Sequence, residues 1–203
     1  MSLLRFEGDL KNPSLLHIYW DGEQVRTVCK SLFIRRLSVF RGCCDKREFW
    51  IKFQEIEAQA ARAEGVRLLA RKGYFGPELK QKLIQKGISE EVADKAVEYF
   101  EQKGYIHDRN RAEGVARREL KKGHGPQYIF QMLKQKKISK EDVANLRPLI
   151  EKEEKQSLQA YLKKRSSALQ GKDRRKVAAQ LLRRGFSYEA IHEVFQNSED
   201  DVD

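Results

Sequence analysis

The sequence predicts a mainly α-helical protein, an elongated array of three tandem three-helix repeats with a small N-terminal β-hairpin. Three observations support this fold class. Glycine and proline lie where helices would begin and end over most of the chain. One pattern of apolar, basic and serine residues recurs three times, about 50 residues apart. An Asp-Gly pair near the N-terminus separates two short segments with strand character.

The first 45 residues differ in character from the rest of the chain. Segment 15–20 is apolar, Asp21-Gly22 follows it, and segment 23–28 alternates in character. Because Asp-Gly readily adopts the positive φ values of a type I′ turn, we expect a β-hairpin over about 14–29. A two-stranded ribbon is marginal alone, so it should pair with a third segment, such as Leu3–Phe6, or lie on the helices.

From about residue 47 onward the sequence contains residues that typically begin and end helices. Gly-Pro pairs occur at 76–77 and 125–126. Proline is favoured in the first turn of a helix, because NH groups there have no hydrogen-bond acceptor within the helix. Ser89, Ser139 and Ser187 are N-cap candidates. The predicted helices span 46–72, 77–86, 90–103, 108–122, 126–136, 140–154, 155–168, 172–184 and 188–196.

These helical segments contain an internal repeat. The pattern L-x3-L-x2-K-G-I-S at 79–89 is matched at 129–139 and at 177–187. In each copy two apolar residues line one helix face, a basic residue ends that helix, and a serine caps the next. A single unit cannot bury both sides of its apolar stripe, so the copies should stack in series. The expected domains are 1–45 (hairpin extension), 46–106, 107–154 and 155–198 (three-helix repeats) and 199–203 (acidic tail).

Composition narrows the classes of function. The chain has 203 residues, of which 35% are charged and 40% hydrophobic, and its formal net charge is +11. Such a balance is typical of a thin body with much solvated surface, and it allows affinity for nucleic acid or for an acidic partner. No apolar run suffices for a membrane span and no secretory leader is recognisable. Three cysteines without a CxxC pair fit a reducing compartment, so we expect a cytoplasmic protein.

Residues suited to catalysis are not grouped in this sequence. It has no nucleotide-binding glycine loop, no HExxH and no GxSxG motif. The four histidines are scattered, and the adjacent pair Cys43-Cys44 cannot hold a tetrahedral zinc by itself. We therefore expect no enzymatic activity, no cofactor and no metal.

Basic residues in the second and third repeats carry the main functional signal. Between 163 and 184 there are nine basic residues and one acidic residue. On a helical wheel, the segments 108–122 and 172–184 each place an apolar arc opposite an arc of almost only basic residues. The alternative interpretation is that these basic arcs are ordinary solvated faces without a binding role. Cations roughly 6 Å apart along a helix could follow the phosphates of a nucleic-acid strand. The candidate contact residues are Arg111, Arg117, Arg118, Lys121, Lys122, Lys172, Lys176 and Arg183.

Four motifs follow one another along the helical part of the chain: the L-x3-L-x2-KG-I pattern at 79–88, G-Y-I-H-D at 104–108, G-H-G-P at 123–126 and R-G-F at 184–186. In this order, over about 60–196, they resemble the bacterial RecX family of regulatory proteins. The hairpin is similar to an N-terminal extension of some members. The second repeat departs from the family at His107, Arg111, Ala112 and Lys137.

The resemblance implies a regulator, mostly an inhibitor, of the recombinase RecA. RecX proteins are understood to dock in the groove of the RecA filament on single-stranded DNA. There they hinder filament extension and with it homologous recombination, ATP hydrolysis and the coprotease activity of the SOS response in DNA repair. The implied partners are the RecA filament and single-stranded DNA, contacted within the filament or directly, and we expect a monomer without membrane association. Two alternatives from the residues are a stand-alone helical nucleic-acid-binding module and an α-solenoid protein adaptor.

Overall fold

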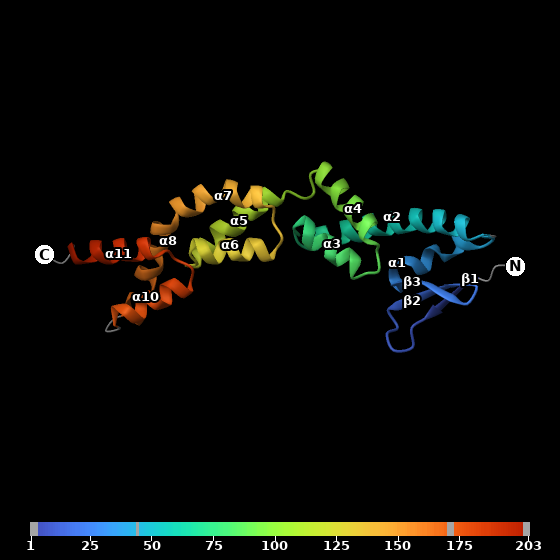
Figure 1. Ribbon diagram of the computed structural model, residues 1–203, viewed down its shortest axis with the longest axis horizontal. Coiled ribbons are helices and arrows are strands. Elements are labelled where there is room, and N and C mark those ends of the chain that lie inside the picture. The colour runs from blue at the N-terminus through green and yellow to red at the C-terminus, as the bar shows by residue number, and fades with distance from the viewer. Residues whose placement is uncertain (1–3, 44, 170–172, 201–203) are drawn as a thin grey trace. The chain divides into compact units, whose positions relative to one another are not determined.

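The computed structural model describes residues 4–43, 45–169 and 173–200, and its chain divides into two compact units, Met1–Ile106 and His107–Asp203. We call them unit 1 and unit 2. Both are largely helical, and unit 1 also contains a small sheet (Figure 1). The predicted class, mainly α-helical with an N-terminal β element, is therefore confirmed. Cys44 and the side chains of the predicted acidic tail, 199–203, lie outside the described residues.

The sheet of unit 1 is an antiparallel meander of β1 (Leu4–Gly8), β2 (Leu15–Trp20) and β3 (Glu23–Cys29). Asp21 and Gly22 join β2 to β3 with φ values of 51° and 85°, as a two-residue type I′ turn requires. The predicted hairpin is therefore confirmed. The third strand, β1, pairs with β2. It begins one residue and ends two residues later than the segment expected from the sequence, Leu3–Phe6.

The helices of unit 1 share a hydrophobic core with this sheet. They are α1 (Lys30–Phe33), the 3-10 helix η1 (Ile34–Phe40), α2 (Lys46–Arg71), α3 (Gly76–Ile84) and α4 (Glu90–Gln102). The three longer helices were predicted to within two residues at each end. The two short ones were not predicted, because four to seven residues carry too little periodicity to be recognised. One core joins sheet and helices, and its fully buried members include Ile18, Phe33, Phe49, Phe53, Leu79 and Phe100.

Unit 2 is built from helices in its described part. They are α5 (Asp108–Lys121), α6 (Pro126–Gln135), α7 (Lys140–Lys152), α8 (Glu154–Lys164), α9 (Ser166–Leu169), α10 (Arg174–Arg183) and α11 (Tyr188–Asp200). The prediction of one helix over 155–168 is wrong, because the chain leaves helical geometry at Arg165, with φ −114° and ψ 12°. The predicted start at 172 is also wrong, because Asp173 is the N-cap of α10 and accepts a 2.8 Å hydrogen bond from the Arg175 NH group.

A buried glutamate caps a later helix in each unit. In unit 1, Glu57 on α2 is 2% exposed and accepts hydrogen bonds from the NH group (2.7 Å) and hydroxyl (2.9 Å) of Ser89, the N-cap of α4. In unit 2, Glu154 on α8 accepts the same two bonds from Ser187, which precedes α11, at 2.7 and 3.0 Å. A carboxylate at a helix N-terminus satisfies NH groups that have no helical partner and favours the helix dipole. This device fixes the helices at the ends of the first and third predicted repeats.

Two turns of unit 2, one at Gly125 and one at Gly185, are joined by backbone hydrogen bonds. The NH group of Gly125, before α6, donates to the Arg184 carbonyl at 2.8 Å, and the NH of Gln127 donates to the Gly185 carbonyl at 3.0 Å. The Arg184 guanidinium donates to the Gly123 carbonyl at 2.7 Å. The G-H-G-P and R-G-F motifs thus meet each other, so their glycines and arginine have a structural role in joining the second and third predicted repeats.

Candidate functional site

Seven of the eight contact residues predicted from the sequence lie in unit 2, on α5 and α10 or at their ends. Exposed side chains are those of Arg117, Arg118, Lys121, Lys122, Lys176 and Arg183, and that of Arg111 is half-buried. Lys172 lies outside the described residues. The cations of α5 point outward because the opposite arc is buried: Ala112, Val115, Ala116 and Leu120 are at most 7% exposed, as the helical wheel predicted.

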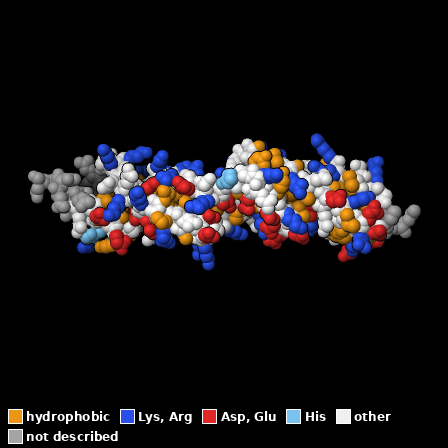
Figure 2. Space-filling model, turned by 90° about the horizontal axis from the view of Figure 1, so that it is seen from above, with side chains coloured by type: hydrophobic (Ala, Val, Ile, Leu, Met, Phe, Trp, Pro, Cys, Tyr) orange, Lys and Arg blue, Asp and Glu red, His pale blue; other side chains and the backbone are white. Residues whose placement is uncertain are grey.

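Acidic side chains engage part of this basic arc. The Arg117 guanidinium pairs with Glu113 at 3.1 Å and also with Glu153, at the end of α7. The Lys122 Nζ lies 2.8 Å from a carboxylate oxygen of Glu119. Lys and Arg side chains on the face of unit 2 drawn in Figure 2 likewise lie among Asp and Glu side chains. The arc on α5 is therefore less single-signed than the wheel indicated, because Glu113, Glu119 and Glu153 neutralise two of its cations.

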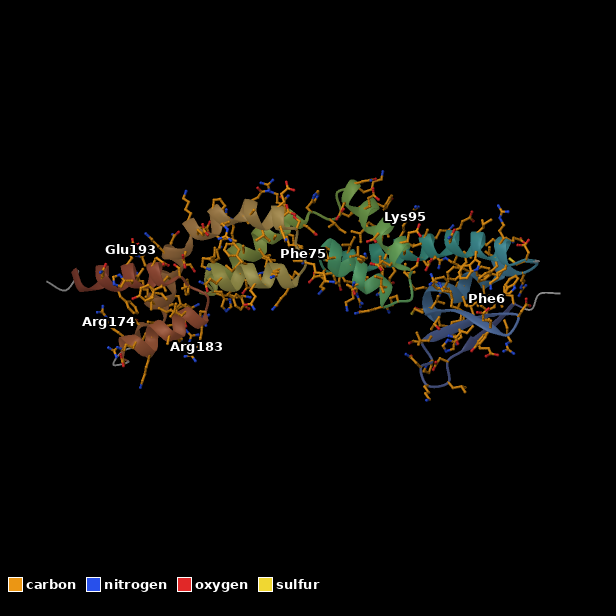
Figure 3. All side chains as sticks on the ribbon, viewed as in Figure 1. Phe6, Phe75, Lys95, Arg174, Arg183 and Glu193 are labelled. Carbon is orange, nitrogen blue, oxygen red and sulfur yellow. The ribbon has the colours of Figure 1, made fainter. Side chains whose placement is uncertain are left out.

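Four of the predicted cations have no acidic partner among the residues that the structure describes. Within the described residues, Arg118, Lys121 and Lys176 form no ion pair, and Arg183 donates only to the Ala179 carbonyl of its own helix, at 3.3 Å. Arg183 ends α10 at the end opposite Arg174 (Figure 3). We call Arg118, Lys121, Lys176 and Arg183 the free cations. They can bind phosphate or carboxylate oxygens without first breaking an internal ion pair.

Glu119 holds two neighbours of the basic arc in place. Its carboxylate accepts from Lys122 at 2.8 Å and contacts the His124 Nδ1 at 2.8 Å, and the His124 ring stacks on Tyr128 with 4.1 Å between centroids. Burial disfavours the charged form, but the hydrogen bonds from Lys122 and His124 outweigh burial and lower the pKa of Glu119 below its ordinary value of 4.5. Lys122 and His124 therefore serve the fold of this turn.

Replacing Glu119 with glutamine should lower the free energy of unfolding by about 1 to 2 kcal/mol at neutral pH, because a neutral amide binds Lys122 less strongly. A carboxylate with a lowered pKa stabilises the fold above its ordinary pKa of 4.5, and this contribution is lost as pH falls through the lowered value. Urea denaturation of both proteins at about pH 7 and about pH 3 measures the difference, which should shrink at the lower pH. A difference that is the same at both pH values would contradict this role.

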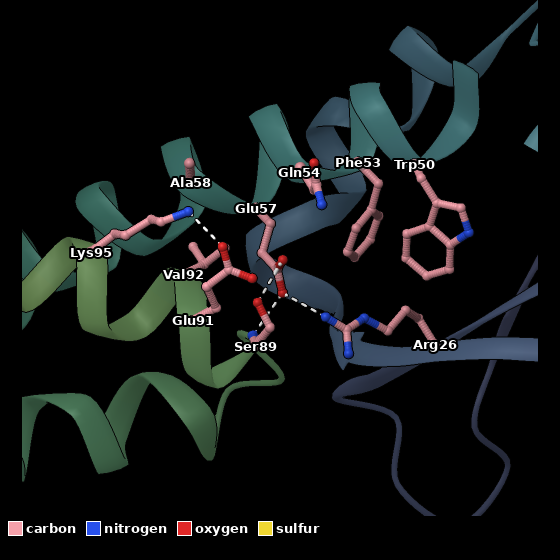
Figure 4. Close-up of a pocket in the computed structure, with 10 residues that line it drawn as sticks. All are labelled: Arg26, Trp50, Phe53, Gln54, Glu57, Ala58, Ser89, Glu91, Val92 and Lys95. Carbon is pink, nitrogen blue, oxygen red and sulfur yellow. Dashed lines mark hydrogen bonds and ion pairs between the residues drawn. The ribbon is translucent and has the colours of Figure 1, made fainter. Parts of the chain in front are cut away.

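A pocket of about 270 Å³ in unit 1 lies between β3, α2 and α4 (Figure 4). Its charged side chains pair with one another: Arg26 donates to Glu57 at 3.1 Å, and Lys95 pairs with Glu91 at 2.6 Å. Trp50 and Phe53 form the aromatic part of the wall. Since these charges are already compensated, the pocket is best explained as part of the junction that Glu57 stabilises.

Another pocket, of about 530 Å³, lies between α6 and α7 in unit 2. The charged residues that line it are Lys134, Lys140 and Arg147, all basic. Sequence reasoning missed these residues because they lie on α6 and α7, outside the basic arcs of α5 and α10. The apolar floor beneath them becomes visible only when α6 and α7 are packed together.

Metal-binding clusters and membrane-spanning helices are absent from the described part of the chain. No three His, Cys, Asp or Glu side chains there are grouped so that they could hold a metal ion. Within the same residues, no helix combines the length and the apolar character that crossing a membrane requires.

Comparisons with known proteins agree on one family. A family model described as "RecX, first three-helix domain" matches residues 61–100. The regulatory protein RecX of Vibrio cholerae serotype O1 is 37% identical over 82 residues, which are 40% of this chain and 54% of that protein. The chain thus matches about half the length of that relative. The regulatory protein RecX of Vibrio vulnificus is 30% identical over 129 residues, which are 62% of this chain and 84% of that protein.

A solved structure shows the same fold. A crystal structure of a regulatory protein RecX matches with a TM-score of 0.63 at 20% sequence identity, covering 97% of this chain and 100% of that one. The structural likeness extends over both units, whereas the family model covers a part of unit 1. The family follows from the identity and coverage of the Vibrio vulnificus relative, with which the family model agrees. The chain belongs to the RecX family of regulatory proteins.

Proposed function

We propose that this protein regulates the RecA recombinase by binding the RecA filament on single-stranded DNA. In this role it mostly inhibits filament extension, and with it the ATPase, recombinase and coprotease activities of RecA. Membership of the RecX family is the observation that carries the proposal, and the relatives' name describes a regulatory protein. The protein would act in the cytoplasm as a monomer, by contact and without catalysis.

The free cations supply the chemistry that such contact needs. Each exposed ion pair contributes only about 0 to 1 kcal/mol of stabilising free energy, so several such pairs must act together to hold a partner. Arg118 and Lys121 lie three residues apart on α5, and Lys176 and Arg183 lie on α10. Side chains three residues apart share a helix face, which suits successive oxygens of a phosphate backbone or a row of carboxylates. Contacts of this kind position a partner without reading base sequence, and salt weakens them.

The proposal is tested by adding the protein, below the concentration of RecA, to RecA assembling on single-stranded DNA. The measured quantity is steady-state ATP hydrolysis. We expect the ATPase rate to fall at ratios well below one protein per RecA monomer, because one bound regulator halts growth of a whole filament end. An ATPase rate that stays at its starting value up to equimolar protein would contradict the proposal.

A stand-alone nucleic-acid-binding module is the second candidate, and the free cations favour it. Such a module would bind bare single-stranded DNA tightly, with an affinity that falls steeply as salt rises. It would lower RecA activity only at concentrations that cover the DNA. Titrating labelled DNA at several salt concentrations, beside the ATPase assay, separates the two functions.

A further inference from the structure

The pocket between α6 and α7 in unit 2 combines an apolar floor with a basic rim. Ile138 is 7% exposed at the base of the pocket, and the half-buried side chains of Val143 and Phe130 complete the floor. A volume of about 530 Å³ is in the range of pockets that hold a ligand or several side chains of a partner. We call this pocket the α6–α7 groove.

The rim of the α6–α7 groove attracts anions. Lys134 lies in the last turn of α6 and Lys140 is the first residue of α7, and neither forms an ion pair within the described residues. Arg147 pairs with Glu151 at 2.8 Å. No acidic residue in the described part of the chain lines the groove. The nearby Asp142 accepts a 2.7 Å hydrogen bond from the hydroxyl of Ser139.

The aromatic ring of the groove is already covered. The Arg147 guanidinium lies over the Phe130 ring, 4.6 Å from its centroid. Single-stranded nucleic acid is usually held by bases that stack on open aromatic faces, and this ring offers no such face on the side of Arg147. The rest of the floor, at Ile138 and Val143, is aliphatic, and it suits an aliphatic side chain better than a base.

We infer that the α6–α7 groove binds an acidic amphipathic segment of a protein partner. Leucine-like side chains of the segment would rest on Ile138 and Val143, and its carboxylates would meet Lys134 and Lys140. A short helix laid in a groove presents apolar residues at spacings of three and four, with charged residues at its flanks, which matches this floor and rim. The inference concerns a surface other than the free cations and does not depend on inhibition of RecA.

The test uses the full chain and a fluorescein-labelled acidic peptide whose leucines fall on one helical face. A peptide of the same composition with its leucines spread around the helix is the control ligand, and labelled oligo(dT) is the nucleic-acid ligand. Fluorescence anisotropy measures each affinity. We expect the first peptide to bind about tenfold more tightly than its control, because only the first can place leucines on the floor while its carboxylates meet the rim.

Two variants of the groove and one matched control locate the binding. Lys134→Glu with Lys140→Glu reverses the rim, and Ala144→Trp fills the groove from an exposed position of α7. Each should weaken binding of the first peptide about tenfold and leave oligo(dT) binding within about twofold. Arg35→Glu with Arg47→Glu reverses the same number of exposed charges in unit 1 and should leave peptide binding unchanged. Circular dichroism confirms that each variant is folded.

Three outcomes would overturn the inference. The first is peptide binding that is absent, or that both groove variants leave unchanged. The second is loss of oligo(dT) binding, without loss of peptide binding, in the groove variants, which would make the groove a nucleic-acid site. The third is peptide binding that appears only after residues 199–203 are deleted, which would assign the groove to the chain's own acidic end.

Discussion

Replacing Gly125 with alanine will destabilise unit 2 by about 3 kcal/mol, since overpacking adds to the loss of hydrogen bonds. A Cβ atom at this position would lie 2.3 Å from the carbonyl carbon and oxygen of Gly185. These are backbone atoms, which cannot rotate away as a side chain can. The hydrogen bonds from Gly125 to Arg184 and from Gln127 to Gly185 would have to lengthen or break.

Gly114 offers a matched control for this substitution. It lies inside α5, and a Cβ atom there would meet nothing within 4 Å. Gly114→Ala should therefore stabilise the protein by about 0.5 to 1 kcal/mol through helix propensity. Urea denaturation followed by circular dichroism compares the two variants with the unmodified protein. Equal stability of Gly125→Ala and the unmodified protein would show that the two turns do not touch as described.

Arg118→Glu combined with Lys121→Glu should raise the protein concentration needed for half-maximal inhibition of RecA about tenfold or more, since reversed charges repel phosphate and carboxylate groups. Both side chains are exposed and form no ion pair within the described residues, so the change should leave the fold intact. The ATPase assay on single-stranded DNA measures the effect, and a thermal melt checks the stability of the variant.

A charge-matched control lies in unit 1. Arg35 and Arg47 are exposed and, in the described part of the chain, form no ion pair. Arg35→Glu with Arg47→Glu changes the net charge by the same amount as the α5 variant. If both double variants lose inhibition equally, net charge explains the effect and α5 is not a specific contact surface.

Local signals in the sequence were sufficient for most elements of the fold. The turn at Asp21 and Gly22 depends on the φ preferences of two neighbouring residues, so it could be predicted without knowledge of the rest of the chain. The buried arc of α5 likewise follows from the 3.6-residue period. The start of α10 was predicted at residue 172, although Asp173 is a typical N-cap residue. The predicted helix therefore began too early, before its own cap.

Contacts between distant residues could not be predicted in this way. The Glu57 carboxylate meets Ser89, which is 32 positions away along the chain. Arg117 pairs with Glu153, which is 36 positions away, so the wheel of α5 alone could not show that this cation is neutralised. The α6–α7 groove has the same origin, because its floor and rim come from two helices whose packing no local pattern reveals.

The most direct test of the proposed function follows the growth of single RecA filaments. Fluorescent RecA is assembled on long single-stranded DNA, and filament length is recorded over time with and without the protein at a sub-stoichiometric concentration. We expect nucleation to continue and the growing ends to stop, so that filaments remain short. The Arg118→Glu, Lys121→Glu variant should restore growth at the same concentration. Filaments that lengthen at an unchanged rate in the presence of the unmodified protein would contradict the proposal that it binds the filament and halts its extension.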